Sequence, residues 1–300
     1  MKVFHEGSTP YLVPTEHPWT VLQKLPVQGR KGLCVAGSGD IPVYFSSFEP
    51  DSLTVVDVSI QACALTELKK AAYRRLNRQE FCEFFFHGIP EANKLWTTLW
   101  GLDPPTSTQR FALYGKLREE ISFEAQQFLD TLILRDSDLK NPFTAFLRPT
   151  DRFHLGLLPC LKSDAFYRLW VQGAHRPFSI IASSLEDFLI STNEAFHIIY
   201  TSNIVEYLRA FHVMHFGLGS FRKFMVSFWQ ALHRVLIPKG FAAFYVCQGI
   251  ETQNFRRLVK ELAPPTFMEY KTQFVPIALR PPLLAGAVWR HVVVLFQKHP

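Results

Sequence analysis

Apolar residues recur along the chain in two ways, as short β-branched runs and as longer segments with helical spacing. The runs at residues 33–36 and 53–58 are typical of parallel strands that are buried on both faces. The spacing predicts helices over residues 60–76 and 221–236, the second ending at Pro238-Lys239-Gly240. Further strands are predicted at residues 178–182, 195–200, 241–247, 268–277 and 291–297.

This alternation predicts an α/β fold with a mostly parallel, Rossmann-like sheet covered by helices on both faces. The last two strands are expected to pair as an antiparallel hairpin. Residues 32–76 and 177–300 form the sheet domain in this interpretation, and residues 1–31 form a lead-in or lid. Residues 77–176 have mostly helical periodicity, which predicts a helical cap inserted into the domain and folded over the strand ends.

A glycine turn and an acidic residue supply the first chemical signal. Gly37-Ser38-Gly39 follows the first predicted strand, and Asp40 stands where a helix N-cap is expected. The second strand ends near Asp57, where a carboxylate can accept hydrogen bonds from two ribose hydroxyls. The pattern predicts a nucleoside site, although the third glycine of the dinucleotide motif is missing. The alternative is an ordinary turn with a capping Asp40 and a surface Asp57.

Composition narrows the class of protein. Hydrophobic residues make up 48% of the 300 positions, enough for a substantial core, and the net charge of +6 comes from dispersed Lys and Arg. We therefore expect no nucleic-acid partner and at most peripheral contact with a membrane. The five cysteines form no C-x-x-C pair, and no signal peptide or membrane span is evident, so a cytoplasmic protein is expected.

The order of elements resembles the class I S-adenosylmethionine-dependent methyltransferase fold. That fold has a seven-stranded sheet ending in an antiparallel hairpin. The resemblance implies that the glycine turn and the acid after the second strand hold S-adenosylmethionine. The implied cofactor-binding positions are Ala36, Gly37, Ser38, Gly39, Asp57 and Val58.

A narrower resemblance concerns the helix after Asp57. Its Q-x-x-x-x-x-E-L-K pattern resembles the S-adenosylmethionine:diacylglycerol 3-amino-3-carboxypropyltransferase family, which makes betaine lipids. The matching residues are Gln61, Glu67, Leu68 and Lys69, and the segments NPFTAFL, LPCL and TSNIVEYL are also similar. The sequence pattern alone places Lys69 on the polar face of this helix, together with Glu67, Lys70, Arg74 and Arg75.

The resemblance implies attack on the γ-carbon of the methionine moiety with release of methylthioadenosine. The acceptor stays open: a lipid hydroxyl, a small amine or alcohol, or the cofactor's own amine, which would close an azetidine ring. A methyltransferase that releases S-adenosylhomocysteine is the alternative, and a catalytically silent S-adenosylmethionine-binding module is a third hypothesis. The oligomeric state is open.

Candidate site residues follow the later strands. Ser202, Asn203, Glu206 and Tyr207 come after residues 195–200 and are the predicted catalytic group, with Ser202 and Asn203 also touching the cofactor. Ser184 and Asp187 follow residues 178–182 and are predicted to contact the adenine. For each, the alternative is a helix cap or a solvated turn.

Aromatic and histidine residues give weaker signals. An aromatic ring beside the sulfonium would stabilise it, and Trp19, Tyr44, Tyr200 and Tyr207 are candidates near strand ends. A core position is the alternative for each of them. His212 and His215 are spaced for one helix face, but no third ligand is nearby in sequence, so no metal site is expected.

Overall fold

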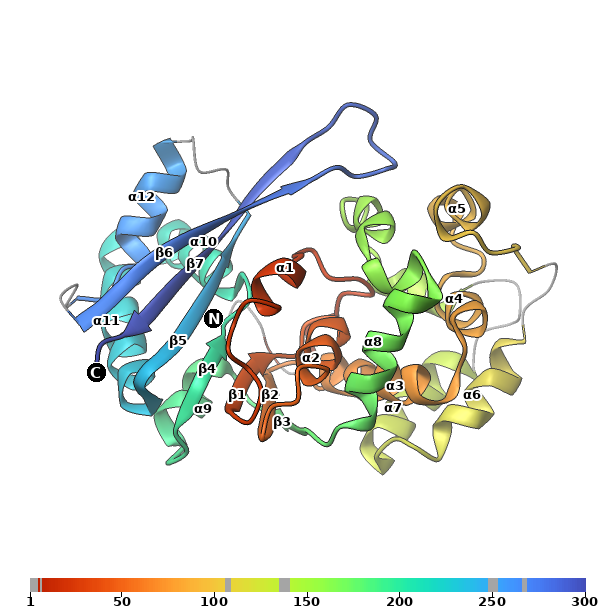
Figure 1. The fold of residues 1–300 in the computed structure, drawn as a ribbon, viewed down its shortest axis with the longest axis horizontal. Coiled ribbons are helices and arrows are strands. Elements are labelled where there is room, and N and C mark those ends of the chain that lie inside the picture. Colours follow the sequence, from red (N-terminus) through yellow and green to blue (C-terminus); the bar gives the residue numbers. More distant parts are fainter. Residues whose placement is uncertain (1–4, 6, 106–108, 135–140, 248–252, 266–268) are drawn as a thin grey trace.

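The protein is built around one seven-stranded sheet (Figure 1). The computed structural model describes residues 5, 7–105, 109–134, 141–247, 253–265 and 269–300. The strand order is β3-β2-β1-β4-β5-β7-β6, in which β7 runs antiparallel to both of its neighbours and the other pairs are parallel. The strands are β1 Lys31–Val35, β2 Ser52–Asp57, β3 Ser179–Ala182, β4 Phe196–Tyr200, β5 Leu236–Val246, β6 Tyr270–Leu279 and β7 Trp289–Lys298. This arrangement confirms the predicted fold class, including the antiparallel C-terminal hairpin.

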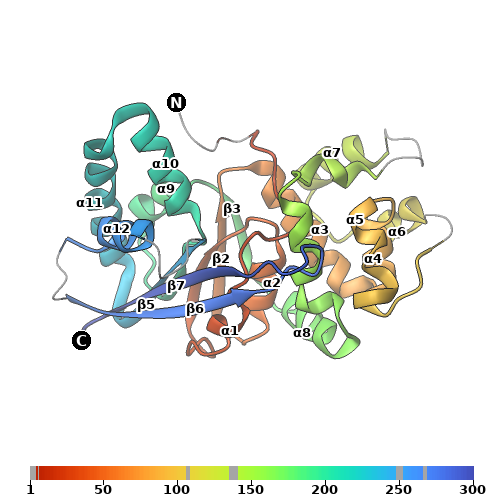
Figure 2. The same ribbon diagram turned by 90° about the horizontal axis from the view of Figure 1, so that it is seen from above.

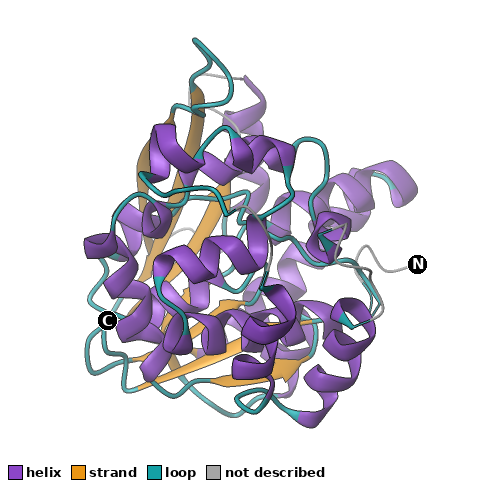
Figure 3. Cartoon of the chain, turned by 90° about the vertical axis from the view of Figure 1, so that its right-hand side faces the viewer, coloured by secondary structure: helices purple, strands orange, loops and turns teal. Residues whose placement is uncertain are grey.

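Helices flank the sheet on both sides (Figure 3). The α-helices before the insertion are α1 Trp19–Leu22, α2 Asp40–Ser46 and α3 Ile60–Arg75. Those of the insertion are α4 Arg78–Phe86, α5 Pro90–Asn93, α6 Arg110–Arg118, α7 Phe123–Ile133 and α8 Asp164–His175, with shorter helical turns at Trp96–Trp100, Pro142–Phe146, Asp151–Leu157 and Pro159–Leu161. The remaining α-helices are α9 Leu185–Ser191, α10 Ile204–Phe216, α11 Leu218–Val235 and α12 Gln253–Leu262.

Successive residues of each strand point to opposite faces and so enter different apolar clusters. In β1, Leu33 belongs to a cluster with α9, α11 and α12, whereas Cys34 belongs to a cluster with α2, α3 and the insertion. Both side chains are fully buried. The continuous apolar runs in the sequence therefore reflect burial on two faces, as expected for the central strands of a parallel sheet.

The insertion packs beside the sheet domain (Figure 2). Its helix α8 crosses α2 so closely that a Cβ on Gly173 would lie 1.9 Å from the Val43 carbonyl oxygen. On another side, Gly156 of the insertion lies against Pro282 in the connection between β6 and β7. The insertion is thus held by the sheet domain at two separate places.

Two predicted boundaries differ from the structure. The stop at Pro238-Lys239-Gly240 is wrong, because α11 ends at Val235 and β5 runs through these residues with a shifted register against β4. Lys239 has a positive φ of 62°, and this irregular backbone lets the strand continue past the proline. The strand predicted from residue 268 begins at Tyr270, and Met268 itself lies outside the described residues.

Three buried histidines lie together where the chain leading to α1, the insertion and β7 meet. Nε2 of His17 lies 2.9 Å from Nδ1 of His154, and the two rings stack. The Tyr245 hydroxyl accepts the backbone N–H of His17 and lies 2.7 Å from Nδ1 of His291. Burial lowers the pKa of all three imidazoles, to about 4 for His154 and His291. The folded state therefore holds these side chains neutral.

We expect this cluster to make the fold acid-sensitive. Between pH 4 and 6.5 the unfolded chain binds protons that the folded histidines refuse, so the free energy of unfolding should fall as the pH drops through this window. Replacing His291 with Gln should reduce that slope by up to one proton, about 1.4 kcal/mol per pH unit. Urea unfolding measured from pH 4 to pH 7.5 tests this. The exposed His215→Gln is the control, and an equal slope in both variants would contradict the assignment.

Candidate functional site

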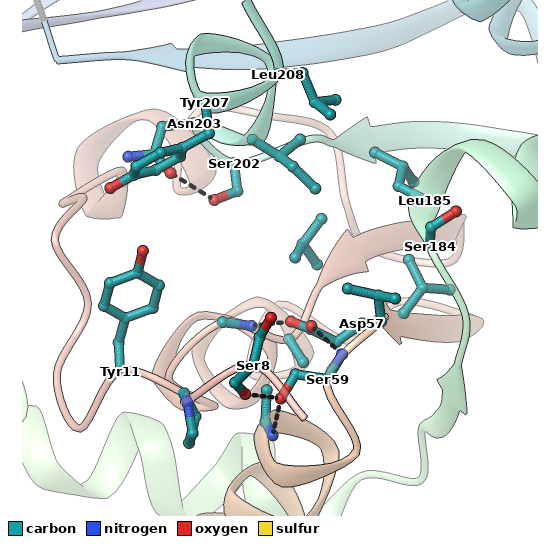
Figure 4. Close-up of a pocket in the computed structure, with 18 of the residues that line it drawn as sticks. Ser8, Tyr11, Asp57, Ser59, Ser184, Leu185, Ser202, Asn203, Tyr207 and Leu208 are labelled. Carbon is teal, nitrogen blue, oxygen red and sulfur yellow. Dashed lines mark hydrogen bonds between the residues drawn. The ribbon is translucent and has the colours of Figure 1, made fainter. Parts of the chain in front are cut away.

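A cavity of about 500 Å³ lies at the carboxyl ends of β1, β2, β3 and β4. This is the edge where α/β proteins with parallel sheets bind their ligands. Predicted residues that line it are Ala36, Gly37, Ser38, Asp57, Val58, Ser184, Asp187, Ser202, Asn203 and Tyr207. The structure therefore brings most of the sequence-predicted residues together in one place (Figure 4).

The two glycines of the turn have different roles. Gly37 has a φ of 56° and lines the cavity, and a Cβ there would meet nothing within 4 Å. Gly39 has a φ of 84°, does not line the cavity, and would place a Cβ 2.9 Å from the Cα of Thr66 in α3. Gly37 thus leaves room for a ligand, while Gly39 allows α3 to approach the turn.

Asp57 lies at the base of the cavity with its carboxylate fixed by the backbone (Figure 4). Gly37 donates its N–H to Oδ2 at 3.0 Å, and Ser59 donates its N–H to Oδ1 at 2.9 Å. Burial raises the pKa of this carboxyl, and the amide hydrogen bonds oppose the increase. Each oxygen can accept a further hydrogen bond, so the group can hold two ligand hydroxyls.

Asp40 is not the N-cap of α2, because Gly39 occupies that position. Its fully buried carboxylate forms an ion pair with Lys69 and accepts hydrogen bonds from Tyr73 at 2.8 Å and Ser38 at 2.9 Å. The prediction that Lys69 lies on a polar helix face is therefore wrong, since its side chain is completely buried. Its Nζ also donates to the Leu12 carbonyl at 2.5 Å. One ion pair thus joins the glycine turn, α3 and the chain that precedes α1.

The cavity is closed by residues 8–16, which we call the N-terminal strap. The Ser8 carbonyl accepts a hydrogen bond from the Ser59 hydroxyl, and Leu12 donates its N–H to Phe146 at 2.9 Å. The insertion was expected to fold over the strand ends, but no described residue between 77 and 176 lines the cavity. The insertion instead supports the strap from behind.

Two tyrosines face each other across one side of the cavity (Figure 4). Tyr11 of the strap and Tyr207 of α10 interact through their hydroxyl groups, and both line the cavity. The Arg148 guanidinium lies 4.2 Å from the centre of the Tyr11 ring and is held by Asp151 at 2.8 Å. Burial, and next the charge of Tyr207, raises the pKa of Tyr11, so both hydroxyls stay protonated hydrogen-bond donors at neutral pH.

Glu16 is a site residue that the sequence analysis missed. It lines the cavity, is 6% exposed, and accepts hydrogen bonds from the Tyr200 and Ser202 hydroxyls. Burial raises its pKa to about 7, although these hydrogen bonds and the Asn203 amide favour the charged form. Nothing local in the sequence signals this role, because its partners lie 184 and 186 positions away.

The predicted catalytic group divides into two parts. Ser202 and Asn203 line the cavity, and Ser202 has a φ of 61°, an unusual conformation for a non-glycine residue. Asn203 occupies the N-cap position of α10, but its side chain makes no capping bond and instead donates to the Cys247 sulfur at 3.5 Å. Glu206 does not line the cavity, and its carboxylate accepts the Cys247 N–H at 2.8 Å. Glu206 therefore supports the strand end rather than facing a ligand.

Ser184 and Asp187 combine both alternatives considered for them. Ser184 is the N-cap of α9 and accepts the Asp187 N–H at 3.0 Å. Its hydroxyl also donates to the Asp187 carboxylate at 2.7 Å. Both residues line the cavity, so a capping role does not remove them from the site.

Most of the aromatic candidates lie in the core. Trp19 and Tyr44 pack with Trp170, and Tyr200 is buried against Glu16. Of the four aromatic candidates, Tyr207 lines the cavity. Another part of the lining, on α10 and α11, is apolar and comprises Ile204, Leu208, Phe211, Phe216 and Phe228.

The histidines offer no metal site. His212 lines the cavity, and its Nδ1 lies 2.9 Å from the Ser220 hydroxyl, whereas His215 is exposed. Within the described residues, no group of three or more His, Cys, Asp or Glu side chains is placed to hold a metal ion.

The charge of the cavity is one-sided. Its described lining includes the carboxylates of Glu16, Asp57, Glu186 and Asp187 but no lysine and no arginine. Such a lining attracts a cationic ligand and repels an anionic one. In the part of the chain that the structure covers, no helix has the length and apolar character needed to cross a membrane.

Comparisons with known proteins find only distant likenesses. No family model and no curated protein matches the chain. Among solved structures, the N-methyltransferase NodS from Bradyrhizobium japonicum, in complex with S-adenosyl-L-homocysteine, is 12% identical with a TM-score of 0.41 over 93% of this chain and 85% of that one. A ribosomal protein L11 methylase from Lactobacillus delbrueckii is 11% identical with a TM-score of 0.37, covering 94% and 77%. A precorrin 8W decarboxylase from Methanobacterium thermoautotrophicum is 8% identical with a TM-score of 0.40, covering 98% and 97%. Likenesses this distant assign no activity, and the narrower resemblance to aminocarboxypropyltransferases remains a prediction.

Proposed function

We propose that the chain binds S-adenosylmethionine in this cavity and catalyses transfer of a carbon group from its sulfonium. The observation that carries the proposal is the orientation of Asp57. Its carboxylate ends β2 inside the cavity, is fixed by the amides of Gly37 and Ser59, and can accept two ribose hydroxyls. A structural Asp57 on the surface would not be expected to face a cavity of this size.

Charge and shape support a sulfonium ligand in particular. The cavity is lined by carboxylates without a described lysine or arginine, which suits a ligand whose reacting centre is positive. Its volume lies within the range usual for cofactor sites, about 300–1,000 Å³. The hydroxyls of Tyr11 and Tyr207, backed by Arg148, are donors that suit the carboxylate of the methionine moiety.

We further propose that the transferred group is 3-amino-3-carboxypropyl. The support is the sequence resemblance around Gln61 and Lys69, since the cavity lining suits either carbon. The nucleophile's lone pair would form a bond to the γ-carbon while the C–S bond breaks, and its electrons remain on sulfur as methylthioadenosine leaves. Attack on the methyl carbon, with release of S-adenosylhomocysteine, is the alternative. The chain selects between them by where it positions the nucleophile.

A substitution tests the ribose assignment. Replacing Asp57 with Ala removes the acceptor for both hydroxyls, and hydrogen bonds to a charged group contribute about 1.5–3 kcal/mol each. The dissociation constant for S-adenosylmethionine, measured by isothermal titration calorimetry, should therefore rise about 100-fold or more. Asp51→Ala is the matched control, because Asp51 is exposed just before the other end of β2. Unchanged affinity in Asp57→Ala, with the fold intact by circular dichroism, would refute the assignment.

Product analysis tests the carbon that is attacked. The purified protein is incubated with S-adenosylmethionine, alone and with a cell lysate, and the nucleoside product is identified by mass spectrometry. Methylthioadenosine is the expected product. S-adenosylhomocysteine in its place would establish the methyltransferase alternative. Tight binding with neither product would instead favour a silent binding module.

A further inference from the structure

Glu16 is the carboxylate that the N-terminal strap places beside Ser202 and Asn203, where β4 ends and α10 begins. A carboxylate this deeply buried is normally neutralised by a cationic partner, because burying an isolated charge is costly. The described structure gives Glu16 hydroxyl and amide donors but records no Lys, Arg or His within ion-pairing distance of it. Its carboxylate faces the cavity without a cation from the chain.

The groups around Glu16 reinforce this requirement. The titratable groups that face it are Cys34 of β1, Tyr200 of β4, Glu206 of α10, and Tyr245 and Cys247 of β5. Each of them is neutral or negative at neutral pH. A cation that enters the cavity at this point therefore gains a favourable interaction that no side chain in this set supplies.

We propose that Glu16 binds the ammonium group of an amine nucleophile and accepts a proton from it as the nitrogen attacks the sulfonium ligand. This inference rests on the proposed function and names the class of acceptor, an alkylamine, at the same site.

The step balances without any further reactant. The ammonium ion transfers one proton to the Glu16 carboxylate, which becomes a carboxylic acid, and the nitrogen regains its lone pair. That pair forms the new N–C bond while the C–S bond breaks and its electrons stay on sulfur, which becomes neutral. The alkylated nitrogen carries the remaining positive charge until it loses a proton to solvent.

The environment of Glu16 suits an amine better than an alcohol. A base titrating near pH 7 can relieve an ammonium ion of its proton, but it is poorly matched to a hydroxyl group that ionises many pH units higher. The donors already on Glu16, the hydroxyls of Tyr200 and Ser202, hold its carboxylate in one orientation without neutralising it. A carboxylate-lined cavity also excludes anionic acceptors.

Two sources could supply this amine, a separate alkylamine or the α-amino group of the bound S-adenosylmethionine itself. The experiment separates them. Wild-type protein is incubated at pH 7.5 with S-adenosylmethionine alone, with added n-butylamine, and with added n-butanol, and all products are identified by mass spectrometry. Azetidine-2-carboxylate formed without additive identifies the internal amine. An N-butyl adduct formed with n-butylamine identifies a separate one.

The variant Glu16→Gln keeps the shape of the side chain and its place on Tyr200 and Ser202 but removes the basic carboxylate. We expect the rate to fall about 100-fold or more, within the usual range for general-base catalysis. The wild-type rate should decline as the pH drops below about 7, and this acidic limb should be absent in the variant. A purely structural role for Glu16 would not move the pH profile. Glu194→Gln is the control, because Glu194 is exposed just before the opposite end of β4.

Binding measurements separate failure of this inference from failure of the proposed function. If the wild type does not bind S-adenosylmethionine, the proposed function falls and the inference with it. If it binds, but n-butanol reacts as fast as n-butylamine, the amine assignment is overturned. If Glu16→Gln retains both the rate and the acidic limb, the role of Glu16 is overturned. With the internal amine, the variant should also bind the cofactor more weakly, because the ammonium contact is lost.

Discussion

The buried ion pair between Asp40 and Lys69 is the interaction on which the rest of the site depends. Asp40 opens α2 directly after the glycine turn, Lys69 comes from α3, and the Lys69 ammonium also binds the Leu12 carbonyl. Removing one partner of a buried pair leaves an uncompensated charge and costs about 3–5 kcal/mol. The hydroxyls of Ser38 and Tyr73 satisfy further lone pairs of Asp40, which makes burial of the pair tolerable. The glycine turn and the strap are therefore positioned by the same two charges.

This arrangement explains why the strap, and not the insertion, closes the cavity. The strap is tied to α3 by Lys69, to the start of the same helix by Ser59, and to the insertion by the bond between Leu12 and Phe146. Three separate supports fix a segment that has no regular secondary structure of its own. Tyr11 and Glu16 consequently reach the cavity from defined directions, which a free lead-in segment would not provide.

The sequence predicted those parts of the site whose signals are local. The glycine turn and Asp57 were found because a strand, a turn, a helix and a second strand follow one another within a short stretch. Glu16, Tyr11 and the burial of Lys69 were missed, because each depends on residues brought together only by tertiary packing. A lysine between other charged residues is typical of a solvated helix face, and only its partners Asp40 and Leu12 reverse that interpretation. The insertion was recognised as helical, but periodicity holds no information about the face on which it packs.

The two carboxylates at the base and the roof of the cavity show how one fold assigns different tasks to the same functional group. Asp57 receives backbone amides, which are rigid donors that favour its charged form and fix it as an acceptor for neutral hydroxyls. Glu16 receives side-chain hydroxyls and a single amide, and burial leaves its pKa near neutrality. A group that titrates near the working pH is suited to gain and lose protons, whereas a group fixed by amides is suited to hold a ligand. The chain thereby separates holding the nucleoside from activating the nucleophile, and it places the second task on the strap.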